Sequence, residues 1–188
     1  HLFLRVLDAE GRVWGQQDAP LKDVDGHRVS AWAAGSTHLT RHTVALEPGI
    51  PAGDYRVVAG LYRLDDLAGL PITIAGRDGG LQLSVAEIAV TPPLAPASEE
   101  ELAIPHAAAL SLDEGAVVIG YALDAEHYPS GQVIGLTLYW RCTAAMAEDY
   151  TLELILRDDT GRLAVAQALP AGPGHPTGQW VPGETLRY

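Results

Sequence analysis

The sequence predicts an all-β fold of two immunoglobulin-like β-sandwich modules in tandem, and three observations lead to it. Apolar and polar residues alternate along much of the chain, short turns rich in Gly and Asp separate these stretches, and one stretch returns about 150 residues later. Alternation at a period of two is typical of strands with one buried face. Short strands separated by such turns favour a sandwich.

The internal repeat is the strongest of these observations. The segment LDAEGRVWGQQDAP at residues 7–20 returns as RDDTGRLAVAQALP at residues 157–170. After a gap of two residues the matches continue through His27 and His175 to Trp32 and Trp180. Because Trp and His are rare residues, these matches indicate two copies of one module.

Each copy is expected to be partial. Residues 115–140 precede the second copy and have no counterpart before His1, and no counterpart of PAGDYRVVAGLY follows the second copy. The predicted modules are residues 1–91 (copy 1, head missing) and 106–188 (copy 2, tail missing). We expect a window from a longer array, although the two partial copies could also complete each other. Incomplete sandwiches leave unpaired strand edges, which recruit other chains.

A linker rich in Pro, Ala and Glu is predicted between the modules, at residues 92–105. This composition lacks periodicity and favours an extended segment. Residues 98–103, SEEELA, are expected to form one short turn of helix at most.

Two β-hairpins are predicted where the repeat begins. In each copy a strand ends at an Asp and the next begins after a Gly, which gives Asp8 with Gly11 and Asp158 with Gly161. An Asp side chain caps its own backbone in such a turn, and Gly permits a positive φ. We therefore give Gly11 and Gly161 structural roles. Further strands are expected at residues 37–46, 53–64, 80–90, 115–123 and 132–142.

Tyr55 is expected to have a structural role as well. It follows a Pro- and Gly-rich turn in LEPGIPAGDYRVVAGLY, residues 46–62. This arrangement resembles the tyrosine corner of immunoglobulin-like sandwiches, in which the Tyr hydroxyl bonds backbone a few residues upstream. The alternative is an ordinary strand tyrosine.

Charge and composition exclude several classes of partner. The formal net charge is −12, which argues against nucleic acid and against an anionic membrane surface. The chain has no apolar run of about 18 residues, so no transmembrane segment is expected within it.

Cys142 is the single cysteine, which excludes an intramolecular disulfide and favours a buried, inert thiol. Three aromatic residues on apolar strands are expected in the core: Tyr62, Tyr139 and Trp140.

Two loops carry the residues best suited to bind a ligand. These are His27 with Trp32 and His175 with Trp180. Aromatic faces stack on sugar rings, and His side chains hydrogen-bond hydroxyl groups, so these pairs are a possible carbohydrate site. In the alternative, which we favour, Trp fills the end of the sandwich and His caps the loop.

No metal, cofactor or catalytic site is expected. His38 and His42 have a zinc-like spacing on a helix, but on a strand they would lie about 13 Å apart. The acidic pairs lack a calcium-loop pattern, and the sequence has no G-x-S-x-G elbow and no phosphate-binding loop. The chain is therefore expected not to be an enzyme.

The pattern YxLxLxLxDxxGR, followed by Q, P, W and G and then by PxGxYRVxxGLY, resembles a known kind of repeat. It is similar to β-sandwich repeats in the extracytoplasmic C-terminal regions of glycosyltransferase-like membrane proteins from Chloroflexota. The segments GYAL and GLTLYW before the second copy fit the same pattern. No glycosyl-transfer residues can be carried over, because the resemblance covers the repeats alone.

The resemblance implies a non-catalytic, extracytoplasmic module at a bacterial cell surface, tethered through other parts of a parent protein. Such a module would act as a spacer or a protein-interaction domain. Its partners would be other protein chains or neighbouring repeats, bound through sheet edges. The alternative is a carbohydrate-binding module that uses the loop His and Trp residues to bind glycans.

Overall fold

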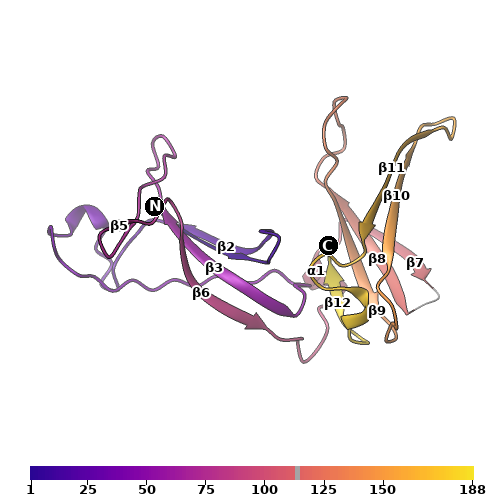
Figure 1. Cartoon of the computed structure of the whole chain (residues 1–188), viewed down its shortest axis with the longest axis horizontal. Coiled ribbons are helices and arrows are strands. Elements are labelled where there is room, and N and C mark those ends of the chain that lie inside the picture. The colour runs from indigo at the N-terminus through magenta and orange to yellow at the C-terminus, as the bar shows by residue number, and fades with distance from the viewer. Residues whose placement is uncertain (113–114) are drawn as a thin grey trace. The chain divides into compact units, whose positions relative to one another are not determined.

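The computed structural model describes residues 1–112 and 115–188 and is almost entirely β-sheet (Figure 1). This confirms the all-β prediction. The strands are β1 (Leu2–Leu7), β2 (Val13–Ala19), β3 (Gly53–Leu61), β4 (Thr73–Ile74), β5 (Arg77–Asp78), β6 (Leu83–Val90), β7 (His106–Leu112), β8 (Ala116–Leu123), β9 (Leu136–Cys142), β10 (Thr151–Arg157), β11 (Leu163–Pro170) and β12 (Thr185–Arg187). The helices are α1 (Glu99–Leu102) and two 3-10 turns, η1 (Val29–Ala31) and η2 (Thr177–Gln179).

The chain divides into two compact units. The first unit contains residues 1–47 and 54–90, and the second contains residues 48–53 and 91–188. The module limits expected from the sequence stay a prediction, and so does their immunoglobulin-like character.

The first unit is built on one four-stranded sheet with the order β2-β1-β3-β6. Strand β1 pairs antiparallel with β2 on one edge and with β3 on the other. Four side chains of these strands are buried with 2–6% of their surface exposed: Val6, Trp14, Tyr55 and Val58. Tyr55 and Val58 are three residues apart on β3 and therefore point to opposite faces, so both faces of this sheet carry buried side chains.

The second unit contains a four-stranded sheet with the order β12-β9-β8-β7. Neighbouring residues of a strand point to opposite faces, and in β9 both faces are covered. Trp140 packs in a buried cluster with Trp180 and Leu186, whereas Tyr139 packs in another with Leu102 and Ile119. The core positions predicted for Tyr139 and Trp140 are confirmed.

The short helix α1 belongs to the second of these clusters. Ser98 and Glu101 form a reciprocal capping box at its start, and Ala103 ends it in a left-handed conformation. Leu102 is 6% exposed. The predicted single turn of helix is confirmed, and its one apolar side chain is buried.

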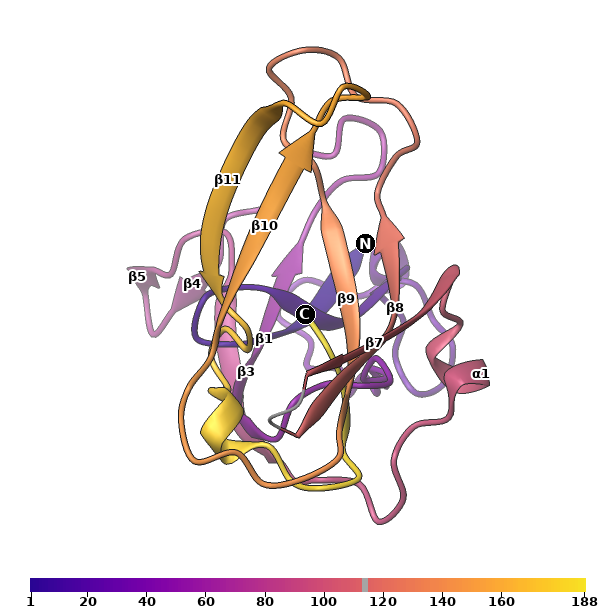
Figure 2. The same cartoon turned by 90° about the vertical axis from the view of Figure 1, so that its right-hand side faces the viewer.

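Strands β10 and β11 form a two-stranded sheet of their own in the second unit. Figures 1 and 2 show this hairpin as a long two-stranded arm. Both predicted hairpins are confirmed, and they share one register. Leu2 lies opposite Ala19 in the first, and Leu152 lies opposite Leu169 at the same place in the second.

The strand expected at residues 37–46 does not form: the segment is irregular and belongs to none of the sheets. Thr37 corresponds in the repeat to Thr185, which begins β12 and pairs with Arg141 of β9. Among the described residues of the first unit no strand takes the place of β9. An alternating pattern without a partner strand leaves the segment irregular.

The core position expected for Tyr62 is also wrong. Its side chain is half-buried, and its hydroxyl donates a hydrogen bond to Asp18 Oδ1 at 2.6 Å.

Of the helices in the described ranges, none is long and apolar enough to cross a membrane.

Candidate functional site

The turns of the two hairpins are held by the same contacts. Asp8 Oδ1 accepts the backbone N–H of Arg12 at 2.7 Å, and Asp158 Oδ1 accepts that of Arg162 at 2.8 Å. Gly11 and Gly161 have φ of 85° and 82°, and a Cβ there would meet no atom within 4 Å. Each Gly is therefore used for its left-handed backbone and not for a close approach.

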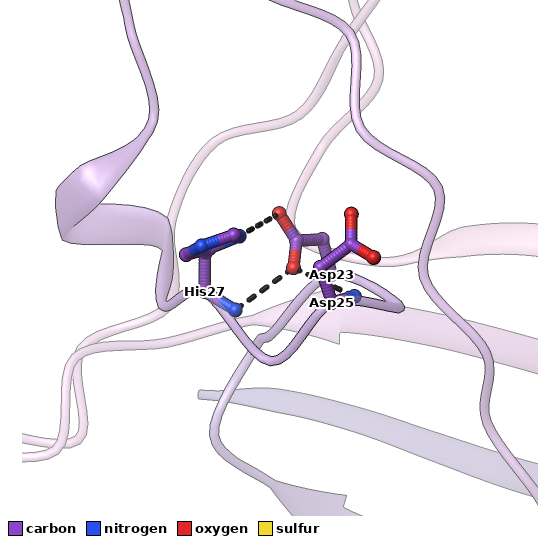
Figure 3. A group of neighbouring side chains, drawn as sticks. All are labelled: Asp23, Asp25 and His27. Carbon is purple, nitrogen blue, oxygen red and sulfur yellow. Dashed lines mark hydrogen bonds and ion pairs between the residues drawn. The ribbon is translucent and has the colours of Figure 1, made fainter.

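A third turn of this kind lies at residues 23–27, in the loop that carries His27. Asp23 Oδ1 accepts the backbone N–H groups of Asp25 at 3.1 Å and His27 at 2.8 Å, and Gly26 has φ of 88°. Figure 3 shows the Asp23 carboxylate turned toward the ring and the backbone of His27. The D-x-x-G spacing in DVDGH is the sequence signal that identifies it.

Asp23 also connects two histidines. Its Oδ2 lies 3.3 Å from His27 Nδ1 and 3.0 Å from His38 Nδ1, and only 6% of its side chain is exposed. Burial raises the pKa of Asp23, but the hydrogen bonds from the His27 backbone and from His38, together with the charge of His27, lower it further than burial raises it. The net pKa lies below the ordinary value, so this carboxylate is ionised at neutral pH.

Asp23, Asp25 and His27 each offer a ligand atom, and these atoms lie within 4.8 Å of one another. Calcium binds six to eight oxygens, which is more than this group supplies. Both oxygens of Asp23 already receive backbone N–H groups or imidazole nitrogens. These contacts explain the group as a tight turn.

Trp32 lies on the same loop and is half-buried. His38 stacks on its indole, with ring centres 4.2 Å apart and planes within 5°. His38 Nε2 lies 2.7 Å from Ser36 Oγ. The loop thus brings together Trp32, the two histidines and Asp23, whereas His42 takes no part in these contacts. The strand geometry assumed for His38 and His42 does not apply here, because their segment is irregular.

The second loop has a different environment. Trp180 is 3% exposed and His175 is 7% exposed. Trp180 Nε1 donates to the backbone oxygen of His175 at 2.9 Å, and its ring packs edge-on against Trp140 and face to face with Tyr188. Trp180 therefore fills the core, as the structural alternative expected. Its ring offers no open face to a sugar.

The two loops differ at an aligned position. Leu186, which is buried in the second copy, stands where His38 stands in the first. Where the second copy packs apolar side chains together, the first copy has a cluster of polar side chains. The sequence analysis missed this difference, although the alignment of the copies contains it.

Tyr55, expected to be structural, is 5% exposed near the start of β3. Its assignment to a tyrosine corner stays a prediction.

Cys142 is 1% exposed, and its thiol donates to the backbone oxygen of Ala144 at 3.2 Å. Burial raises the pKa of the Cys142 thiol, and the charge of Glu184 raises it further. The predicted burial of this thiol is confirmed.

A groove in the second unit has a mainly apolar lining. It has a volume of about 450 Å³ and lies between the hairpin, the end of β8 and residues 132–136. We call it the open groove. Its apolar lining includes Leu123, Val133, Ile134, Leu154, Leu156 and Val165. Leu156 is 47% exposed and Val165 is 53% exposed.

Comparisons with known proteins give no relative: no protein family, curated protein or solved structure matches the chain.

Proposed function

We propose that the chain is a non-catalytic protein-interaction module that binds another protein chain in the open groove of its second unit. The single observation that carries the proposal is the groove itself. Val133 is 88% exposed, and Ile134, Leu156 and Val165 are 42–53% exposed around one cavity. Contiguous exposed apolar surface of this kind marks a binding site.

A neighbouring strand edge gives the groove a means of recognition. Among residues 1–112 and 115–188, β10 pairs with β11 on one edge, and its other edge has no partner strand. An added strand would gain main-chain hydrogen bonds along this edge and bury its apolar side chains in the groove. We therefore expect extended segments of another protein to bind.

A peptide-display library tests this proposal without a known partner. Random twelve-residue peptides are selected on the chain, and each binder is then measured against the variant Val165→Glu. Leu163→Glu is the matched control, since Leu163 lies on the same strand and is also 53% exposed but does not line the groove. We expect binders that lose at least tenfold in affinity to Val165→Glu and keep it with Leu163→Glu. Equal binding to all three chains would refute the proposal.

The setting follows from the resemblance of the repeats and is part of the same proposal. We place the module in the extracytoplasmic part of a larger bacterial protein held at the membrane or cell surface, as a spacer or interaction domain. The acidic net charge of −12 supports a partner other than nucleic acid. Labelling of intact cells with a membrane-impermeant reagent, followed by detection of the module, tests this location.

Carbohydrate binding is the second candidate, and one observation favours it in the first unit. Trp32 is half-buried and stacks on His38, and the same loop carries His27, whose exposed ring can hydrogen-bond hydroxyl groups. Trp14, Trp140 and Trp180 are each at most 3% exposed. A change in tryptophan emission on glycan addition would therefore report Trp32.

The test is a glycan titration of the chain and of Trp32→Phe. A saturable change that is lost in Trp32→Phe supports the site. No change at millimolar glycan rejects carbohydrate binding and leaves the groove proposal untouched.

A further inference from the structure

A second hollow, of about 690 Å³, lies in the first unit. Its lining comes from the end of β2 and from two later segments, residues 20–24 and 39–42. The backbone N–H of Val24 donates to the oxygen of Leu39 at 3.0 Å, which joins these two segments. We call this cavity the β2 hollow.

Two cationic side chains line the β2 hollow, Lys22 and Arg41. Both are exposed, and neither has an ion-pair or hydrogen-bond partner for its side chain among residues 1–112 and 115–188. Asp23 also lines the hollow, but its carboxylate already receives backbone N–H groups and imidazole nitrogens. A chain with a net charge of −12 repels anions as a whole, so this pair of cations is a local exception.

Two uncharged polar groups of the same lining also lack partners. Gln17 Oε1 and His42 Nε2 are enclosed, and neither has a hydrogen-bond partner in the described part of the chain. Polar atoms are costly to bury unpaired. The terminal amide of Gln and the ring of His turn about bonds with broad angular preferences. A rotation about such a bond would therefore bring each atom to a polar group held in the hollow.

We propose that the β2 hollow binds a small organic anion, whose carboxylate or phosphate is held by Lys22 and Arg41 and whose hydroxyl groups bond with Gln17 and His42. An Arg guanidinium pairs with two oxygens of a carboxylate or phosphate at once, and a Lys ammonium adds a point charge. A hydroxyl group both donates and accepts, so it suits the acceptor Gln17 Oε1 and either tautomer of His42. The site goes beyond the proposed interaction function, because it shares no residue with the open groove.

The experiment uses Lys22 as its own reporter. It is the single lysine of the chain, so isotope-labelled lysine gives one side-chain NMR signal. The full chain is titrated at constant ionic strength with glycerate, glycerol phosphate, acetate and glycerol. Arg41→Ala tests the site, and Arg28→Ala is the matched control, since Arg28 is an exposed cation of the same unit that does not line the hollow. An unchanged circular-dichroism spectrum confirms that both variants fold.

We expect a saturable shift of the Lys22 signal with glycerate, with glycerol phosphate or with both, and none with glycerol. The anion that binds more tightly identifies the oxyanion. Arg41→Ala is expected to weaken that binding about tenfold, because it removes a charged hydrogen-bond donor. Arg28→Ala is expected to leave it unchanged. Acetate has no hydroxyl group and is expected to bind more weakly than glycerate.

Three results would overturn the inference. The first is a Lys22 signal that no anion shifts to saturation at millimolar concentrations. The second is an equal shift with glycerol, which carries no charge. The third is equal weakening by Arg41→Ala and Arg28→Ala, which would make the effect one of net charge and not of this hollow. Acetate binding as tightly as glycerate would overturn the roles of Gln17 and His42. Peptide binding in the open groove is measured separately and is unaffected by any of these results.

Discussion

The tryptophan at one position of the repeat has different surroundings in the two copies. Trp180 packs against Trp140 from β9, whereas the first unit has no β9 counterpart among its described residues and leaves Trp32 half-buried. The burial of a side chain depends on the residues that pack against it. Both copies of the repeat have the tryptophan, but only the second has the residues that bury it. The sequence analysis identified both tryptophans but did not distinguish their environments.

This difference predicts unequal costs of truncation. Trp180→Ala is expected to lower the free energy of unfolding of the second unit by about 3–5 kcal/mol, since it removes a fully buried aromatic side chain. Trp32→Ala is expected to cost the first unit less than half as much. Urea unfolding followed by circular dichroism measures both, and equal costs would contradict the assignment of Trp180 alone to a core.

Asp23 predicts a pH dependence confined to its loop. Its pKa in the folded protein is lowered, so its contribution to stability is complete above the unfolded value of about 3.9 and is lost as pH falls through the folded value. A carbon-detected NMR titration of the carboxyl group is expected to give a midpoint below 3.9. Collisional quenching of Trp32 should rise over the same interval, and Asp23→Asn should remove that rise. A midpoint at or above 3.9 would contradict the contacts described.

At the scale of elements, local pattern was sufficient for the hairpins and insufficient for the sheets. The D-x-x-G turns define both hairpins because the Asp and Gly act within five residues of each other. Residues 37–46 alternate between apolar and polar side chains as a strand does. A strand also needs a partner strand, and the alternation of one segment does not tell which distant segment will pair with it. The lining of the open groove was not predicted for the same reason, since Leu123, Ile134 and Val165 meet there from separate parts of the chain.

The two hairpins also predict unequal tolerance on β2 and β11. A Cβ on Gly15 would lie 2.6 Å from the backbone oxygen of Ala45, which covers β2. Val165 holds the equivalent place on β11 and is 53% exposed. Gly15→Val is expected to cost about 1–3 kcal/mol by overpacking, and Val165→Gly less than about 1 kcal/mol. Urea midpoints check both; a harmless Gly15→Val would mean that residues 44–47 do not cover β2.

At the scale of the whole molecule, the two units are expected to unfold separately. Asp8 accepts hydrogen bonds from the Arg12 backbone and from Trp14 Nε1, at 2.7 and 2.8 Å, inside the first unit. Asp8→Ala is therefore expected to destabilise that unit by about 2 kcal/mol. Cys142, buried in the second unit, is the reporter for the other half of the chain.

The measurement is the rate of thiol labelling at Cys142 across a urea series. Its midpoint is expected to be unchanged in Asp8→Ala, whereas the loss of β-sheet signal begins at lower urea. Asp8→Asn keeps one of the two acceptor oxygens and is expected to have a smaller effect on the β-sheet signal than Asp8→Ala. A shift of the labelling midpoint in Asp8→Ala alone would show that the two units unfold as one.

The hairpin with its D-x-x-G turn forms in two settings, as part of a four-stranded sheet and as a two-stranded sheet of its own. Its geometry is the same in both, down to the register. Contacts between residues close in sequence form fast, and hairpins close in about 1–10 μs. In the first unit a growing chain would therefore complete this hairpin before β3, which pairs with β1, has been synthesised.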